Sequence, residues 1–117
     1  MIQIVPHLKI LLAVNPVDFR KGIDGLVSVC KSQLQQDPFS GAVFVFRNRS
    51  HTALKLIVYD GQGFWLCQKR LSRGRLGWWP QSNGEALHPL AAQELSVLLY
   101  NGNPVDAGFS EPWRKLH

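Results

Sequence analysis

Three short apolar runs separated by turn residues constrain the fold of this 117-residue chain more than any other feature. They span residues 42–47, 54–60 and 64–71 and are rich in valine, isoleucine and aromatic residues, which favour strands. The Asp-Gly-Gln-Gly sequence at residues 60–63 is a strong hairpin signal. Because consecutive strands with short connections favour antiparallel pairing, the sequence predicts a small antiparallel β-meander.

Helical and strand-like patterns flank the meander on both sides. Residues 9–14 are apolar and compatible with a first strand, and residues 89–100 predict a helix. Another set of apolar residues at helical spacing predicts an earlier helix, with one face formed by Ile23, Leu26, Val27, Cys30 and Leu34. Asn15-Pro16 is typical of a helix start, although nearby glycines also allow a start near Asp24. We therefore predict a single α+β domain over residues 1–117, with about four strands packed against two helices.

Composition favours a folded, reduced, intracellular protein. Hydrophobic residues make up 45% of the chain and charged residues 18%, which argues for a packed core and against disorder. The two cysteines, Cys30 and Cys67, lie far apart among apolar neighbours and resemble buried thiols more than a disulfide framework. The N-terminal apolar stretches are short and interrupted, so no signal peptide or membrane span is expected. These features predict a cytoplasmic location.

Positive charge is concentrated in one part of the chain, which has a formal net charge of +5. In a meander, seven cations would converge at one edge of the sheet, namely Arg47, Arg49, Lys55, Lys69, Arg70, Arg73 and Arg75. Like charges repel, so folding alone gives no reason to gather them, whereas a phosphate backbone would neutralise several. We therefore predict a nucleic-acid-binding edge, to which four further residues can contribute: Arg20, Lys21, Asn48 and Trp78.

Simpler interpretations of the same residues stay open. Basic strand ends are often solvated rims that discourage aggregation. A tryptophan beside a proline, as in Trp79-Pro80, covers a core more often than it stacks on a base. Arg20-Lys21 can be a solvated pair at a helix start.

No arrangement of residues indicates catalysis, a metal site or a cofactor. The acids show no spacing typical of an acid–base pair or a two-metal centre, and the histidines lack metal-ligand spacing. His51 alone lies within the predicted basic edge, where a nuclease could use it as a general base. A loop histidine near phosphates is the simpler interpretation, so we predict a protein that is not an enzyme.

Several separated motifs, in order along the chain, resemble one known family. The motifs are Val17-Asp18-Phe19-Arg20-Lys21-Gly22-Ile23-Asp24-Gly25-Leu26, Asp37-Pro38-Phe39-Ser40-Gly41, Phe44-Val45-Phe46-Arg47-Asn48-Arg49, Lys55-Leu56, Tyr59-Asp60-Gly61, Gly63-Phe64-Trp65-Leu66, Lys69-Arg70-Leu71, Gly74 and Trp79-Pro80. Together they resemble the accessory protein of the IS66 insertion-sequence family, labelled TnpB or Orf2-like and unrelated to the RNA-guided nucleases that share the first label. Tyr59 departs from the family pattern, in which tryptophan is common before the Asp-Gly turn.

The resemblance implies a role in transposition of a bacterial mobile element, alongside a separate transposase that carries the catalytic acids. It leaves two molecular roles open. The first is DNA binding, at the element ends or the target, through the basic edge. The second is an adaptor that docks on the transposase through residues 81–117, where four acids outnumber two cations: Glu85, Glu94, Asp106 and Glu111 against Arg114 and Lys115. An open sheet edge would also make a homodimer plausible.

Overall fold

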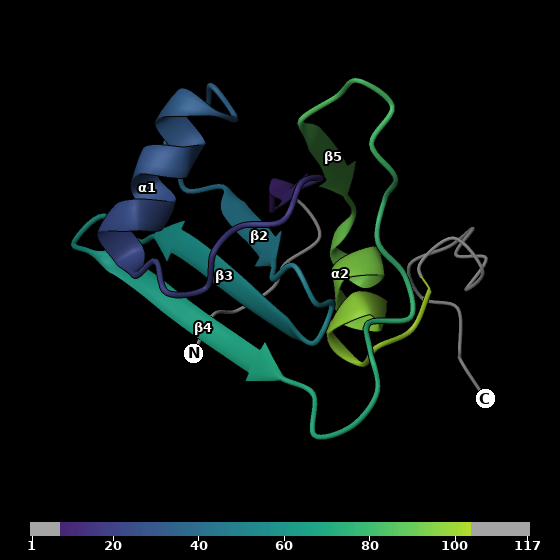
Figure 1. The fold of residues 1–117 in the computed structure, drawn as a ribbon. Coiled ribbons are helices and arrows are strands. Elements are labelled where there is room, and N and C mark those ends of the chain that lie inside the picture. Colours follow the sequence, from purple (N-terminus) through teal and green to yellow (C-terminus); the bar gives the residue numbers. More distant parts are fainter. Residues whose placement is uncertain (1–7, 104–117) are drawn as a thin grey trace.

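The computed structural model describes residues 8–103 and contains one five-stranded mixed sheet, in the order β4-β3-β2-β1-β5. A helix covers each face of this sheet (Figure 1). The elements are β1 (Ile10–Ala13), α1 (Ile23–Ser32), β2 (Val43–Arg47), β3 (Ala53–Tyr59), β4 (Phe64–Arg70), β5 (Leu87–Leu90) and α2 (Ala92–Leu99). The predicted α+β class is therefore confirmed, with five strands where about four were expected.

Strand pairing follows the predicted meander at one side of the sheet. β2 pairs antiparallel with β3, and β3 pairs antiparallel with β4 over its whole length. β1 pairs parallel with β2, so the connection through α1 is a crossover between neighbouring strands. β5 pairs antiparallel with the other side of β1. The carboxyl ends of β1, β2 and β4 consequently share one edge of the sheet with the beginning of β3.

Two boundaries differ from the sequence prediction. The predicted helix over residues 89–100 begins only at Ala92, because residues 87–90 form β5. Pro89 made this strand hard to foresee, since proline cannot donate to a sheet and is confined largely to edge strands, which is the position that β5 occupies. The first helix begins at Ile23, so Asn15-Pro16 does not start it, and the alternative start near Asp24 is the better prediction.

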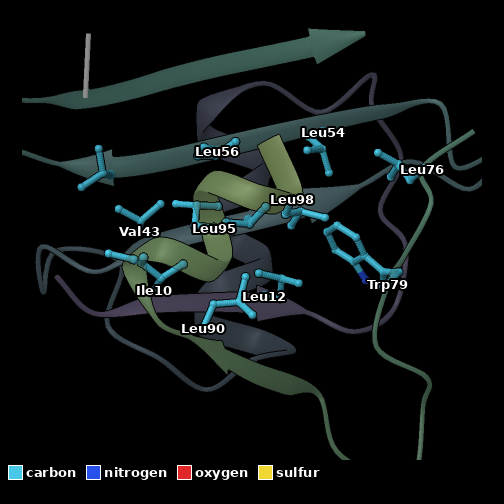
Figure 2. Close-up of a cluster of buried hydrophobic side chains, with 13 residues drawn as sticks. Ile10, Leu12, Val43, Leu54, Leu56, Leu76, Trp79, Leu90, Leu95 and Leu98 are labelled. Carbon is cyan, nitrogen blue, oxygen red and sulfur yellow. The ribbon is translucent and has the colours of Figure 1, made fainter. Parts of the chain in front are cut away.

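The sheet separates two hydrophobic clusters. On the α2 face, Leu95 and Leu98 of the helix pack over Leu54 and Leu56 of β3 (Figure 2). The other face, here called the α1 face, buries apolar residues of β1 and β2 against the predicted helical face, including Leu26, Cys30 and Leu34. Burial on both faces explains why the central strands are almost continuously apolar instead of alternating with polar residues.

The two cysteines are free thiols, and Cys30 is fully buried. Burial raises the pKa of the Cys30 thiol to about 12, so this side chain stays protonated at neutral pH and behaves as a small apolar residue. Among residues 8–103, no helix combines the length and apolar character needed to cross a membrane.

Candidate nucleic-acid interface

Three connections meet at the sheet edge where β1, β2 and β4 end: residues 14–22, 48–52 and 71–76. Backbone hydrogen bonds join them. The amide of Val17 donates to the carbonyl of Arg47 at 3.0 Å, and the amides of Leu71 and Leu76 donate to the carbonyls of Thr52 and His51 at 2.9 and 2.7 Å. Cations far apart in the sequence are thereby held on neighbouring loops. We call this surface the basic edge; its cations are Arg20, Lys21, Arg47, Arg49, Arg70, Arg73 and Arg75.

Most cations of the basic edge are exposed and have no acidic partner among residues 8–103. Arg49, Arg70, Arg73 and Arg75 are all exposed. Within residues 8–103 the only ion pair joins Arg20 to Asp18, so none of these four guanidinium groups is neutralised by a described carboxylate. Lys21 is exposed and equally unpaired within the same range. The edge therefore presents uncompensated positive charge.

Arg20 differs from its neighbours because Asp18 binds it. The Arg20 Nε and Nη2 atoms donate to the carboxylate at 2.7–3.2 Å, and the Arg20 amide donates to Asp18 Oδ1 at 2.9 Å. These hydrogen bonds lower the pKa of Asp18 to about 2. The pair closes the turn before α1 and cancels most of the charge of Arg20. Arg20 thus lies at the predicted edge but contributes little to its positive potential.

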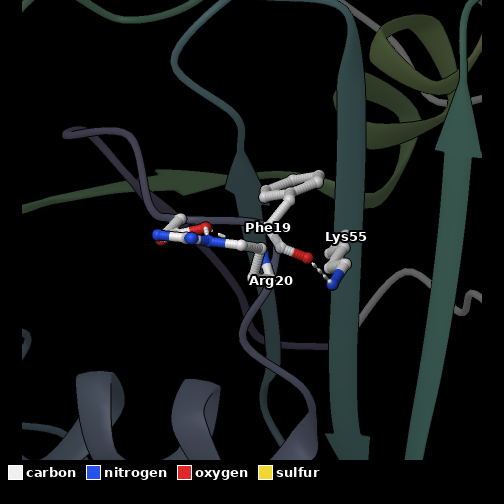
Figure 3. A network of polar contacts seen from close by, with 4 residues as sticks. Phe19, Arg20 and Lys55 are labelled. Carbon is white, nitrogen blue, oxygen red and sulfur yellow. Dashed lines mark hydrogen bonds and ion pairs between the residues drawn. The ribbon is translucent and has the colours of Figure 1, made fainter.

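Lys55 does not join the exposed cations, contrary to the sequence prediction. It is only 5% exposed and points to the α1 face, paired in register with Phe46 of β2. Its Nζ donates to the carbonyl of Phe19 at 2.8 Å (Figure 3) and to that of Lys21 at 2.9 Å. The ammonium group also lies 5.0 Å from the centre of the Phe19 ring. Lys55 therefore holds the 14–22 loop at the edge from inside.

Two other predicted contact residues have structural partners. Lys69 donates to the carbonyl of Leu99 at the end of α2, where a cation is favourable, and lies over the ring of Tyr100. Asn48 shapes the β2–β3 loop: its Oδ1 accepts from the amides of Thr52 and Ala53 at 2.9 and 3.1 Å. Both side chains are therefore engaged in contacts within the protein, although Lys69 is also exposed.

The adjacent tryptophans have different environments. Trp79 is 9% exposed, belongs to the cluster of the α2 face (Figure 2), and its Nε1 donates to the carbonyls of Ala13 and Val14 at 3.1 and 3.2 Å. Trp79 therefore covers the core, which is the simpler of the two interpretations of the Trp79-Pro80 sequence. Trp78 is partly exposed and lies edge-on to His88, with ring centres 5.6 Å apart.

A cavity of about 500 Å³ opens between the ends of β1 and β2 and the segment after residue 75. We call it the Arg47 pocket; its lining is Val14, Asn15, Arg47, His51, Leu76, Gly77, Trp78, Trp79, Pro80, Gln81 and Ser82. Arg47 donates from Nη1 to the carbonyl of Asn48 at 3.2 Å and lies over the Trp79 ring, but its shielded Nε has no hydrogen-bond partner in the described part of the chain. Burial lowers the pKa of Arg47. The pocket thus contains a partly desolvated cation that none of the described carboxylates neutralises.

His51 should make folding sensitive to mild acid. Burial, then the charges of Arg47 and Arg75, lower its pKa below 6.5. Since protonation is harder in the folded protein, stability is complete above about pH 6.5 and falls as pH drops below that value towards the folded-state pKa. Urea midpoints measured from pH 7.5 to pH 5 should decline in the parent and flatten in His51→Gln. The urea midpoint of the matched variant His88→Gln should still decline with falling pH. An equal dependence of the midpoint on pH in all three proteins would show that His51 is not the group responsible.

No group of acidic residues within residues 8–103 indicates a catalytic or metal site. Asp60, at the edge opposite the basic edge, accepts from the amides of Gln62 and Gly63 and from Trp65 Nε1 at 2.7–3.0 Å, as expected of a turn residue. Within this range no three histidine, cysteine, aspartate or glutamate side chains come together as a metal site would require.

The protein is a small basic α+β domain in which exposed arginines lie at one edge of the sheet, on and beside loops that backbone hydrogen bonds join. The chain matches the family model described as IS66 Orf2 like protein over residues 8–106, and it belongs to that family. It is 41% identical over 92 residues to the uncharacterised protein y4jC of Sinorhizobium fredii, a match that covers 79% of this chain and 77% of the relative. It is 39% identical over 93 residues to the uncharacterised protein y4hO of the same organism, with 80% and 79% covered. No solved structure matches. Family membership indicates an accessory role in transposition.

Proposed function

We propose that the protein is a non-catalytic DNA-binding accessory factor that contacts the element ends or the target through the basic edge. The observation that carries this proposal is the set of four exposed arginines without a carboxylate partner among the described residues: Arg49, Arg70, Arg73 and Arg75. Arg49 lies on the 48–52 loop, Arg70 is the last residue of β4, and Arg73 and Arg75 lie on the 71–76 loop, which backbone hydrogen bonds join to the 48–52 loop. Lys21 extends the surface from the third loop.

The charge arrangement suits a phosphate backbone. In the free protein the exposed guanidinium groups repel one another. On binding, the DNA phosphates neutralise their charge and counterions condensed on the DNA are released, which favours association. Guanidinium groups also form paired hydrogen bonds with phosphate oxygens, which favours arginine over lysine at such contacts. Because the loops are tied to each other and to the sheet, little conformational entropy has to be lost when DNA binds.

Salt dependence provides the test. If the four arginines each neutralise one phosphate, the logarithm of the binding constant should fall with the logarithm of salt concentration with a slope of about −3.6. Affinity for a duplex should then drop about 150-fold between 50 and 200 mM salt. Each substitution of Arg49, Arg70, Arg73 or Arg75 by glutamine should reduce the slope by about 0.9, as measured by fluorescence anisotropy.

Lys31→Gln is the matched control. Lys31 is exposed in the last turn of α1 and lies over the Phe39 ring, next to the β3–β4 hairpin and away from the basic edge. The substitution removes one positive charge outside the proposed surface, so the slope of the salt dependence should stay unchanged. A flat salt response of the parent, or the same loss of slope in Lys31→Gln, would contradict the proposal.

The alternative role as a transposase adaptor loses part of its basis. Glu94 accepts from the amide of Ala91 at 2.8 Å and so caps the start of α2. Asp106, Glu111, Arg114 and Lys115 lie outside the described residues. Of the acids considered for docking, Glu85 alone is exposed in the described range and has no ion pair there. A single carboxylate does not make an acidic docking surface, so DNA binding is the function that the geometry supports best.

A further inference from the structure

We infer that the Arg47 pocket receives one unpaired nucleotide of the bound DNA, with its phosphate at Arg47 and its base against the tryptophan side. This inference rests on the proposed DNA binding and names a feature of the DNA that the protein would recognise. It is carried by the pocket's unsatisfied cation, by its lining, and by its position beside the basic edge.

The cation is the first argument. Arg47 is partly buried and its Nε is shielded from solvent without a hydrogen-bond acceptor. No aspartate or glutamate lines the pocket. A partly desolvated guanidinium group without an anion is costly, because it has lost water and gained no charge partner. A phosphate group entering the pocket would supply the missing charge partner to the partly exposed guanidinium group.

The remaining lining suits a nucleobase. Trp78 and Pro80, which are both partly exposed, provide apolar surface on which a base can stack, whereas Trp79 is only 9% exposed. Asn15, Gln81 and Ser82 add side-chain donors and acceptors of the kind that pair with base edges. A volume of about 500 Å³ lies within the range of small-molecule sites. One nucleotide has this combination of a single anionic group and a flat ring.

Position is the third argument. The pocket lies at the carboxyl ends of the parallel strands β1 and β2, where open sheets of α/β proteins commonly bind ligands. Arg47 ends β2 at the basic edge and His51 lies on its 48–52 loop, so a DNA backbone held by the exposed arginines would pass beside the opening. A base within a duplex is stacked and paired, so only an unpaired base can enter.

The test compares three labelled DNAs of the same sequence: a blunt duplex, the duplex with a one-nucleotide overhang, and the same overhang without its base. Overhangs at the 3′ and 5′ ends are tested separately. The parent protein should bind one overhang about tenfold more tightly than the blunt duplex, the effect expected for one base stacked on an aromatic ring. The abasic overhang should lose most of this preference. A free deoxynucleoside monophosphate should erase the preference without displacing the blunt duplex.

Two variants separate the pocket from the edge. Arg47→Gln should abolish the preference for the overhang, whereas Arg73→Gln should weaken all three DNAs by a similar factor and keep the preference. Ser82→Trp, which would fill the mouth of the pocket from an exposed position, provides a second block that leaves Arg47 in place. Thermal midpoints of all variants verify folding.

The outcomes distinguish the two proposals. Equal affinity of the parent for all three DNAs, or an overhang preference that survives both Arg47→Gln and Ser82→Trp, would overturn the pocket and leave DNA binding intact. Displacement of the blunt duplex by the free nucleotide would also overturn it, because the pocket would then hold backbone. Failure to bind any of the DNAs at low salt would overturn the proposed function itself.

Discussion

Replacing Lys55 with methionine should lower the free energy of unfolding by about 2–3 kcal/mol, although the two side chains are similar in length. The substitution keeps the buried stem but removes the ammonium group that bonds the carbonyls of Phe19 and Lys21. Hydrogen bonds from a charged donor are worth more than neutral ones, and the two carbonyls lose their described partner. A loss of this size corresponds to a thermal midpoint lower by roughly 10 °C or more.

Trypsin offers a local measurement of the same effect. It cleaves after Arg20 and Lys21, and both lie in the loop that Lys55 holds. Lys55→Met should therefore increase cleavage in this loop as well as lower the urea midpoint. The matched variant Lys31→Met changes an exposed lysine on α1 and should shift stability by less than about 0.5 kcal/mol. Unchanged stability and cleavage in Lys55→Met would show that the ammonium group contributes nothing net.

Sheet topology explains which parts of the interface could be predicted from the sequence. The Asp-Gly-Gln-Gly turn and the strand-forming runs define the meander, and the meander brings Arg49, Arg70, Arg73 and Arg75 to one edge whatever the side-chain details. The prediction that Lys55 is an exposed cation was wrong, because its environment depends on which face of the sheet its position in the strand points to. It alternates with Leu54 and Leu56, which face α2, so it must face α1 once both sides of the sheet are covered.

The Arg47 pocket illustrates what the sequence could not provide. Its lining comes from four separate stretches of chain: residues 14–15, Arg47, His51 and residues 76–82. Their meeting depends on the parallel pairing of β1 with β2 and on the 71–76 segment returning to the β2–β3 loop. The sequence predicts the order strand, helix, strand, but not which strand of the meander the first strand pairs with. The Phe-Arg-Asn-Arg sequence could suggest cations, but not that Arg47 would turn to the α2 face while Arg49 stays exposed.

In this small domain, different cations contribute to folding stability and to the proposed DNA binding. Lys55 and Lys69 bond to backbone carbonyls and hold elements in place. The exposed arginines make no described ion pair, so their removal should cost little stability and much affinity. Only some of the cations are therefore available for binding, and an estimate of the binding surface from net charge alone would count too many of them.

Trp79→Ala should lower the free energy of unfolding by about 4 kcal/mol, the cost typical of removing a buried tryptophan. The indole packs in the cluster of the α2 face and bonds the carbonyls of Ala13 and Val14 at the end of β1. Small domains have only about 5–15 kcal/mol of stability, so this variant should be partly unfolded at modest temperature. Far-UV circular dichroism during urea unfolding measures the effect, because the substitution itself changes tryptophan fluorescence.

Two companion variants divide this loss between packing and hydrogen bonding. Trp79→Phe retains a buried ring but no donor, so it should cost about 1–2 kcal/mol. Trp78→Ala, next in the chain but partly exposed, should cost less than Trp79→Ala, since less apolar surface returns to water. If Trp78→Ala were the more damaging of the two alanine variants, the assignment of Trp79 as the core residue would be wrong. Trp79, instead of Trp78, would then be the tryptophan available to a base in the Arg47 pocket.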